Sequence, residues 1–343
     1  MAKYRCAIIG CGGRASGHAT AYKHVTRGEL VACCDVIEDK REAFAEEHAL
    51  TGYADAREMI EAEKPDLVHL VTWPDTRVEL MTLMDELNVP TCIVEKPIAC
   101  QVADWRQLVD LEARSATKFA VGQQFRYHPN MTRCREALRS GDLGKVLFLE
   151  FTAGMNISGQ GTHIIDWAMS LNEDQPAVRV FGCASGTEGM ETLHPAPDAT
   201  VGQVLFANGV SGLWVNGLTT PRVSDDGPTY AHCRVAAHAE WGRTLYEEFG
   251  KWEIASAKGI ESGAPTSEEI VESNHQAQAN LTEAMFDWLE DDHKPAGTNL
   301  KIGLHQWQVV LGLYASALWR KPVDIPFAPP DDLFDSLNAA LSE

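Results

Sequence analysis

The sequence predicts an α/β protein in which a doubly wound parallel sheet is followed by an α+β domain with a large, open sheet of mixed or antiparallel strands. Three observations favour this fold. Apolar, strand-like runs alternate regularly with helical patterns from residue 5 to 126. A glycine-rich turn follows the first run, at 10–15. Between 178 and 254, strand-like segments recur with turn residues between some of them, which is typical of an antiparallel or mixed sheet.

The turn at 10–15 has the pattern of a dinucleotide-binding loop. The strand at 5–9 runs into Gly10, Gly12, Gly13, Arg14 and Ala15, and a helical segment follows. The first glycine allows a tight turn, the second lets the backbone approach a diphosphate, and the small alanine lets the helix pack on the strand. Backbone N–H groups and the helix N-terminus would then face the phosphates.

The second strand, at 29–34, ends at Asp35, close to the usual distance of about 20 residues beyond the glycine motif. A carboxylate there accepts hydrogen bonds from ribose hydroxyls and repels a 2′-phosphate, so NAD is favoured over NADP. Arg14 could oppose this preference by pairing with a phosphate. Together these features predict a Rossmann domain over 1–122. We expect a domain for substrate binding and oligomerisation over 123–343, with a helix at 300–320 that could pack back on the first domain.

The remaining elements follow from periodicity and turn residues. In the first half we expect strands at 65–72, 92–94 and 119–126, helices at 39–48, 76–88 and 102–109, and an amphipathic turn or helix at 55–63. In the second half we expect strands at 146–152, 178–185, 200–206, 210–218, 233–239 and 244–249. Helices are expected at 130–140, from 159 onward, at 268–290 and at 300–318, with a mobile loop at 256–267.

Two further strand ends belong to the sheet edge that carries Gly10 and Asp35. One is the loop Thr72-Trp73-Pro74, and the other is Glu95-Lys96-Pro97. A lysine between a carboxylate and a proline at the carboxyl end of a parallel strand lies where open α/β sheets place their chemistry. Taken alone, the second stretch also fits a surface turn with a solvated lysine.

Composition indicates an ordinary globular chain and argues against two classes of partner. Apolar residues make up 45% and charged residues 23% of the 343 residues. The formal net charge of −20 argues against nucleic-acid binding, which requires a basic face, and against anionic membranes. No apolar run reaches transmembrane length, and the first nine residues lack the layout of a signal peptide.

Cysteine and histidine usage points to a reducing compartment and to no metal. The nine cysteines form no CxxC pair, and the twelve histidines form no HExxH motif or Cys/His cluster. We therefore expect reduced thiols in a cytoplasmic protein, and no metal site.

In this order and spacing the motifs resemble the Gfo/Idh/MocA family, the glucose–fructose oxidoreductase and inositol dehydrogenase group. The motifs are GxGxxA with a following His18, the terminal Asp35, VTWP at 71–74, EKPIA at 95–99 and VGQQFRYHP at 121–129. The resemblance implies that His163, in an HxxD setting, contacts a sugar hydroxyl and acts with the EKP lysine, Lys96.

We expect Lys96 and His163 to be the catalytic pair. The expected cofactor contacts are Gly10, Gly12, Gly13, Arg14, Ala15, Asp35, Thr72, Trp73, Pro74, Glu95, Lys96 and Gln124. The expected substrate contacts are Arg126, Tyr127, His128, Asn156, Asp166 and Trp167. For Trp167, stacking on a sugar face and burial in the core remain open.

One position departs from the family pattern. Many members have an aspartate four residues before the histidine, and this chain has Gly159 there. The Lys–Asp–His trio is therefore incomplete. Either Asp166 takes part of the missing role, or the substrate is held differently.

The first functional hypothesis is an NAD-dependent oxidoreductase that moves hydride between a sugar, cyclitol or related polyol hydroxyl and the nicotinamide. A lysine has a free pKa of about 10.4, so Lys96 would need burial beside an oxidised nicotinamide to act as a base near neutrality. The second hypothesis is a redox-neutral glycosidase that oxidises, eliminates and reduces with tightly bound NAD. The third is a non-catalytic protein that senses the cofactor.

The resemblance also implies a partner. In the family, the large sheet of the second domain exposes a face that pairs with another subunit, so we expect a homodimer or homotetramer. Leu213-Trp214-Val215 would place apolar side chains on both faces of that sheet. The alternative is a monomer whose own helix covers the second face.

Overall fold

The computed structural model describes residues 3–223 and 229–342, and the chain divides into two compact units. The first unit comprises Met1–Ala99, Asp104–Tyr127 and Asn274–Leu304. The second comprises Cys100–Ala103, His128–Ser273 and His305–Glu343. Each unit is thus assembled from several stretches of chain, whereas the division expected from the sequence has a single boundary after residue 122.

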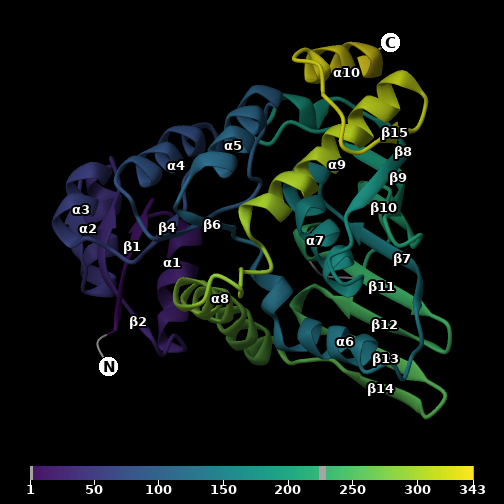
Figure 1. Cartoon of the computed structure of the whole chain (residues 1–343), viewed down its shortest axis with the longest axis horizontal. Coiled ribbons are helices and arrows are strands. Elements are labelled where there is room, and N and C mark those ends of the chain that lie inside the picture. The colour runs from purple at the N-terminus through teal and green to yellow at the C-terminus, as the bar shows by residue number, and fades with distance from the viewer. Residues whose placement is uncertain (1–2, 224–228, 343) are drawn as a thin grey trace. The chain divides into compact units, whose positions relative to one another are not determined.

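The first unit contains a parallel six-stranded sheet with the order β3-β2-β1-β4-β5-β6 (Figure 1). Its strands are β1 (Tyr4–Ile9), β2 (Gly28–Cys34), β3 (Thr51–Tyr53), β4 (Leu67–Leu70), β5 (Thr91–Val94) and β6 (Lys118–Val121). The helices are α1 (Gly13–Thr20), α2 (Glu38–His48), α3 (Ala56–Glu63), α4 (Arg77–Glu86), α5 (Val102–Arg114) and α8 (Ser267–Glu290). This is the doubly wound parallel sheet that the sequence predicts.

Helices cover both faces of this sheet, which explains why its central strands are apolar throughout. On one face, α8 packs Leu281, Met285 and Phe286 against buried side chains of β1, β4 and β5. On the same face, α1 and α2 pack against Ile8 and Cys33. Figure 1 shows α4 and α5 on the opposite side of the sheet.

The second unit contains a nine-stranded sheet with the order β14-β13-β12-β11-β7-β10-β9-β8-β15. The strands are β7 (Val146–Ala153), β8 (Ala177–Ser185), β9 (Ala199–Phe206), β10 (Ser211–Gly217), β11 (Cys233–Ala239), β12 (Gly242–Glu247), β13 (Trp252–Ser256), β14 (Gly259–Gly263) and β15 (Val323–Asp324). β10 runs parallel to β7 and antiparallel to β9. The predicted large mixed sheet is confirmed.

Helices α6 (Pro129–Arg139), α7 (Thr162–Leu171) and α9 (Leu300–Trp319) accompany this sheet, and α10 (Leu333–Ser342) ends the chain. Trp167 of α7 packs edge-on against Tyr246 of β12, with ring centroids 5.1 Å apart. Leu313 of α9 lies against β8 and β9, where a Cβ added at Gly202 would come within 2.5 Å of it. The other face of the sheet carries Phe181, 48% exposed, and Leu213, 39% exposed.

Short helical turns join several elements. They are η1 (Ala21–Lys23), η2 (Pro74–Thr76), η3 (Gln124–Tyr127), η5 (Glu188–Glu191), η6 (Thr229–Ala231) and η7 (Glu248–Gly250), together with the π-helical η4 (Ile157–Gly161). No helix of the described residues is long and apolar enough to cross a membrane.

The structure corrects two expectations about individual elements. The stretch 256–267 is not a mobile loop, because β13 and β14 form a hairpin there, with Ala255 paired to Ile260. The strand expected over 119–126 ends at Val121, and the turn η3 follows it. The short strand β3 and the helix α10 were not anticipated.

Candidate active site

The glycine turn of the first unit combines one tightly packed glycine with two open ones. Gly10 has a φ of +94°, and a Cβ there would lie 2.3 Å from the Val71 carbonyl oxygen. A Cβ at Gly12 or Gly13 would meet no atom within 4 Å. Helix α1 begins at Gly13, and Ala15 is buried against the sheet. The turn therefore has the open space and the free helix N-terminus that a diphosphate requires.

Asp35, at the end of β2, is fixed beside this turn. Its Oδ2 accepts a hydrogen bond from the Cys11 backbone N–H at 2.8 Å, and its Oδ1 accepts one from the Ile37 N–H at 2.8 Å. The carboxylate thus holds the glycine turn in place, and its position beside the turn fits a ribose-binding role.

Arg14 has partners within the protein. Its Nε donates to Glu95 Oε1 at 2.8 Å, and its Nη2 donates to Gln278 Oε1 at 2.9 Å. The side chain is 41% exposed. In the structure the guanidinium therefore pairs with the Glu95 carboxylate just after β5, a contact that the sequence analysis did not predict.

The loop after β4 is joined to the lysine turn through a buried arginine. Arg77, the first residue of α4, is 2% exposed, and its Nη2 lies 3.1 Å from the Lys96 carbonyl oxygen and 3.4 Å from the Thr72 carbonyl oxygen. Within the loop, Pro74 is buried and Trp73 is 62% exposed.

Glu95 lies at the carboxyl end of β5 and packs closely against Gly122. A Cβ at Gly122 would come within 3.0 Å of its Oε1. That oxygen accepts from Arg14 and lies 3.0 Å from His18 Nε2, while Oε2 accepts from the Lys96 backbone N–H at 3.2 Å. Burial alone would raise the pKa of Glu95, but Arg14 and His18 hold it well below its ordinary value. Glu95 is therefore ionised near neutral pH.

The stretch after β6 adds three of the predicted residues to the first unit. Gln124 is 6% exposed, and its Oε1 has no hydrogen-bond partner among the described residues. Arg126 is 4% exposed and lies against Gly297. The Tyr127 hydroxyl accepts from the Gly297 backbone N–H at 2.9 Å. The buried amide oxygen of Gln124 is the atom best suited to accept a bond from a ligand.

In the second unit, His163 and Asp166 lie on α7, three residues apart. His163 is 3% exposed and Asp166 is fully buried. Gln306 of α9 donates from its Nε2 to Asp166 Oδ1 at 2.9 Å. The π-helical turn η4 leads directly into α7, and such turns occur often at functional sites.

Asn156 and Gly159 explain how the chain departs from the family pattern. Asn156 caps η4, and its Oδ1 accepts from the Gly159 backbone N–H at 2.8 Å. A Cβ at position 159 would lie 3.1 Å from that oxygen and 3.3 Å from Met155 Cε. An aspartate at 159 would therefore require Asn156 to move.

Two predicted substrate residues occupy core positions in the second unit. Trp167 is fully buried against Tyr246. His128 is also fully buried, and its Nδ1 accepts from the Asn130 N–H at 3.2 Å as the N-cap of α6. Burial lowers the pKa of His128 to about 4. For Trp167 these contacts favour the core interpretation that the sequence left open.

Several polar residues of these sites were missed by the sequence analysis. In the second unit, Gln160 donates from Nε2 to the Tyr230 carbonyl at 3.1 Å and lies 3.4 Å from Glu248 Oε1. In the first unit, His69 and Tyr22 lie beyond His18. Gln160 could have been noticed because it stands between Gly159 and the HxxD motif. His69 and Tyr22 lie close to the VTWP motif and to His18 in the sequence, but neither belongs to a motif, and Glu248 lies far from all of them.

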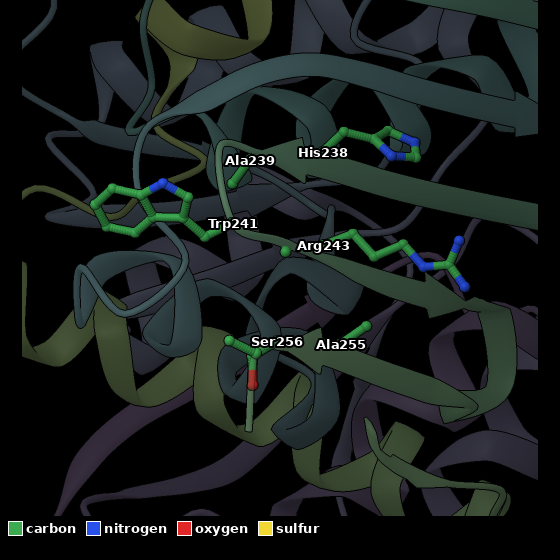
Figure 2. A pocket seen from close by; sticks show the side chains of 8 residues that line it. His238, Ala239, Trp241, Arg243, Ala255 and Ser256 are labelled. Atoms are coloured by element: carbon green, nitrogen blue, oxygen red, sulfur yellow. The ribbon is translucent and has the colours of Figure 1, made fainter. Parts of the chain in front are cut away.

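Within the first unit, the structure brings Gly10, Asp35, Thr72, Glu95 and Lys96 to the carboxyl ends of neighbouring parallel strands. Within the second unit, it brings Asn156, His163 and Asp166 to η4 and α7. A pocket on the second sheet contains none of the predicted residues. It lies over β11–β13 and is lined by His238, Ala239, Trp241, Gly242, Arg243, Ala255, Ser256 and Ala257 (Figure 2).

Comparison with known proteins agrees with the motifs. A sequence model of the oxidoreductase family with an NAD-binding Rossmann fold, GFO_IDH_MocA, matches residues 4–123. The chain is 28% identical over 229 residues to the D-apiose dehydrogenase of Paraburkholderia graminis, which covers 62% of this chain and 60% of that protein. It is 27% identical over 236 residues to the rhizopine catabolism protein MocA of Rhizobium meliloti, covering 64% of this chain and 73% of that protein.

Solved structures share the whole fold. An oxidoreductase from Agrobacterium radiobacter in complex with NAD+, L-tartaric acid and magnesium has a TM-score of 0.79 and 17% identity, covering 94% of this chain and 98% of that chain. A levoglucosan dehydrogenase in complex with NADH has a TM-score of 0.80 and 14% identity, with coverage of 94% and 99%. At these identities the likeness establishes the fold alone. The resemblance expected from the motifs is confirmed over residues 4–123, which match the model of the Gfo/Idh/MocA family of oxidoreductases.

Proposed function

We propose that the protein is an NAD-dependent oxidoreductase that transfers hydride between a polyol hydroxyl carbon and the nicotinamide. The observation that carries the proposal is the convergence of the open glycine turn, Asp35 and the Glu95-Lys96 turn at one edge of the parallel sheet. Open α/β sheets bind their ligands at this edge. When bound, NAD would supply the hydride acceptor at its nicotinamide ring.

The residues of the first unit fit the cofactor in distinct ways. The turn from Gly10 to Ala15 would hold the diphosphate, because Gly12 and Gly13 face open space. The Asp35 carboxylate would accept hydrogen bonds from the adenosine ribose and would repel a 2′-phosphate, so we expect NAD to bind more tightly than NADP. The loop 72–74 and the Gln124 amide would contact the rest of the molecule.

Lys96 is the proposed base for the hydroxyl proton, with His163 as its partner. An ordinary lysine is protonated at neutral pH, so the base form requires a neighbouring positive charge or burial. Oxidised nicotinamide carries such a charge. His163 would share the proton or orient the hydroxyl, because the nitrogens of an imidazole can donate or accept a hydrogen bond. Asn156 and Asp166 would contact the other hydroxyl groups of the substrate.

The substrate class follows from the relatives. Proteins similar to this chain are named D-apiose dehydrogenase and inositol 2-dehydrogenase, and both names denote enzymes of polyhydroxylated substrates. We therefore propose a sugar, cyclitol or related polyol as the substrate of this chain. The choice among these classes requires an assay.

A redox-neutral glycosidase is the second candidate, and Gly159 is the observation that favours it. Without an aspartate at this position, the usual trio for simple alcohol oxidation is incomplete. An enzyme that oxidises a glycoside, eliminates its substituent and reduces the product would turn over without consuming NAD. A protein that only senses the cofactor would need neither Lys96 nor His163.

The two candidates are separated by one assay. Sugars, cyclitols and glycosides are incubated with the enzyme, with and without added NAD or NADP. NADH absorbance and released product are then measured. Stoichiometric NADH supports the dehydrogenase. Several turnovers of a glycoside without added NAD and without net NADH support the glycosidase.

The proposed base is tested by replacing Lys96 with methionine, which keeps most of its length and removes the amine. We expect kcat to fall by about 10²–10⁴-fold while NAD still binds. Lys40→Met, at an exposed position on α2, is the control and should leave kcat unchanged. Turnover of Lys96→Met at the wild-type rate would exclude Lys96 as the base.

We also propose that the exposed face of the nine-stranded sheet pairs with a second subunit. Paired residues across four neighbouring strands place Phe181, Gln203, Leu213 and Glu150 in one row on this face. Phe181 and Leu213 are 48% and 39% exposed. Exposed apolar side chains in such a row favour burial against another protein surface.

A further inference from the structure

Two buried histidines and a partly buried tyrosine of the first unit, which the proposed mechanism does not use, lie in a row that ends at Glu95. The Tyr22 hydroxyl is 2.8 Å from His69 Nε2, and His69 Nδ1 is 3.0 Å from His18 Nδ1. His18 Nε2 is 3.0 Å from Glu95 Oε1. His18 is 1% exposed and His69 is fully buried. The row thus crosses the interior of the unit from η1 to the end of β5.

The order of donors in this row has one solution when both rings are neutral. The Glu95 carboxylate can only accept, so the proton of His18 must be on Nε2. His18 Nδ1 is then an acceptor, and the proton of His69 must be on Nδ1. His69 Nε2 in turn accepts from the Tyr22 hydroxyl. Each group donates to its neighbour on the side of Glu95. Because the carboxylate can only accept, it determines the direction of every bond in the row.

The charges around the row are consistent with neutral rings. Burial lowers the pKa of His18 and, more strongly, that of His69, and Arg14 acts in the same direction on both. Burial raises the pKa of Tyr22 well above its ordinary value, as do Cys6 and Glu283. The other charged groups that face the row are Glu95 itself and Lys96.

Glu95 links this row to the proposed base. Its Oε1 receives the end of the row together with Arg14, and its Oε2 accepts from the backbone N–H of Lys96. A carboxylate with three donors has little freedom to rotate. Any loss of the His18 donor would loosen Glu95 and, with it, the backbone of Lys96.

We propose that Tyr22, His69 and His18 are positioning residues, which form a one-directional hydrogen-bond chain that orients Glu95 and thereby the Lys96 turn. The proposal rests on the proposed function, in which Lys96 takes the substrate proton. It assigns the hydroxyl of Tyr22 a specific task, which is to donate to His69 Nε2 and so hold the ring that in turn donates to His18.

Removing the hydroxyl shows what that task is. In a Tyr22→Phe variant, His69 Nε2 loses its donor and becomes a buried unsatisfied acceptor, which is costly. The Glu95 carboxylate still requires the proton of His18 on Nε2, so the tautomers should not change. The His69 ring, no longer held by a donor, can shift instead, which would weaken its bond to His18 and the bond of His18 to Glu95.

The tautomers are tested directly by nitrogen NMR of protein labelled at histidine. In the wild type we expect His18 to be protonated on Nε2 and His69 on Nδ1, with assignments from His18→Gln and His69→Gln. In Tyr22→Phe both tautomers should persist, while the His69 Nε2 signal should shift because that nitrogen loses its donor. A His18 that is protonated on Nδ1, or on both nitrogens, in the wild type at neutral pH would overturn the chain.

The kinetic test compares two tyrosines of the same unit. Tyr22→Phe should lower kcat by about tenfold, because even a small misplacement of a catalytic group slows the reaction. The KM for NAD should stay within about twofold of the wild-type value. Its kcat–pH profile should also shift. Tyr4→Phe is the control, because its hydroxyl bonds Glu290 at the surface, at 3.0 Å. If Tyr22→Phe lowers thermal stability but leaves kcat and its pH profile unchanged, the residue is only structural and the proposal is wrong.

A double variant tests the mechanism of coupling. In His18→Gln the amide nitrogen can donate to Glu95 while the amide oxygen accepts from His69. We therefore expect His18→Gln to retain more activity than His18→Leu. Because Tyr22 acts only through His18, adding Tyr22→Phe to His18→Leu should change kcat by less than about twofold. The same tenfold loss in both backgrounds would show that Tyr22 acts by another route.

These outcomes separate the present proposal from the proposed function. Wild-type turnover by Lys96→Met would remove the base and, with it, the need to position its turn. The NMR result does not depend on turnover, so it establishes or excludes the chain in either case. Inactive Lys96→Met together with unaffected Tyr22→Phe would leave the dehydrogenase in place and reject only the positioning role.

Discussion

Gly10 and Gly12 belong to the same motif but have different roles in the folded turn. Gly10 has a positive φ and no room for a Cβ, because the Val71 carbonyl oxygen would be 2.3 Å away. Gly12 has open space at the same place. The first glycine is therefore required by the fold, and the second is free for a ligand.

This contrast predicts opposite outcomes for the same substitution. Gly10→Ala should lower the unfolding free energy by about 3 kcal/mol or more, because a backbone carbonyl must move and the left-handed conformation is strained. Gly12→Ala should cost less than about 1 kcal/mol and should instead weaken NAD binding by about tenfold or more. Denaturant unfolding and calorimetric titration with NAD measure the two effects. A stable Gly10→Ala that binds NAD normally would contradict the assignment.

At the scale of single residues, the sequence predicts short motifs but not contacts between residues that are far apart in the chain. The glycine turn, Asp35 and Glu95-Lys96-Pro97 are short patterns with fixed spacing, so they could be identified. The contacts of Glu95 could not, because Arg14 meets it across 81 positions and His18 across 77. Nothing in the sequence around His69 or Tyr22 indicates that the two side chains meet.

The turn η4 contains the one position, Gly159, at which the sequence motifs depart from the Gfo/Idh/MocA pattern. Its cap, Asn156, occupies the space that a side chain at position 159 would need. The glycine and the asparagine therefore form a matched pair. An aspartate at 159 would require Asn156 to move, so a single substitution at 159 would not restore the role of the family's aspartate.

We therefore expect Gly159→Asp to lower kcat/KM rather than raise it. The new Cβ would press on Asn156 Oδ1, and the carboxylate would lie beside an acceptor oxygen, which should break the cap of η4 at a cost of about 1 kcal/mol. Gly159→Ala separates the steric part of the effect from the charge. Activity of Gly159→Asp above that of the wild type would show that the site lacks an acid and that Asn156 yields easily.

Elements were predicted well where apolar periodicity was strong, and poorly where polar residues formed strands. The strands β8 to β12 were all expected within a few residues of their observed ends. The hairpin β13–β14 was missed because 256–267 is rich in Gly, Ser and charged residues, and every residue of Gly259–Ser262 is exposed. Its pairing comes from the neighbouring strand β12, through Tyr246 and Trp252, which no local pattern reveals.

On the scale of the whole molecule, the sheets of the two units differ in how their faces are covered. The sheet of the first unit is covered on both faces by its own helices. The sheet of the second unit has helices on one face and a row of exposed side chains on the other. A stable interface buries about 1,200–2,000 Å² in total, which one face of a nine-stranded sheet is large enough to supply.

The subunit proposal is tested by placing a charge in the middle of that row. Leu213→Arg should convert a dimer or tetramer into a monomer, because moving a guanidinium from water into an interface carries a desolvation cost. The isolated subunit should tolerate the change, since Leu213 is 39% exposed there. Val36→Arg, at a position 85% exposed in the first unit, is the matched control and should not change the mass. Light scattering coupled to size exclusion measures each mass. A wild type that is monomeric at micromolar concentration, or a Leu213→Arg variant with the same mass as the wild type, would place the interface elsewhere or remove it.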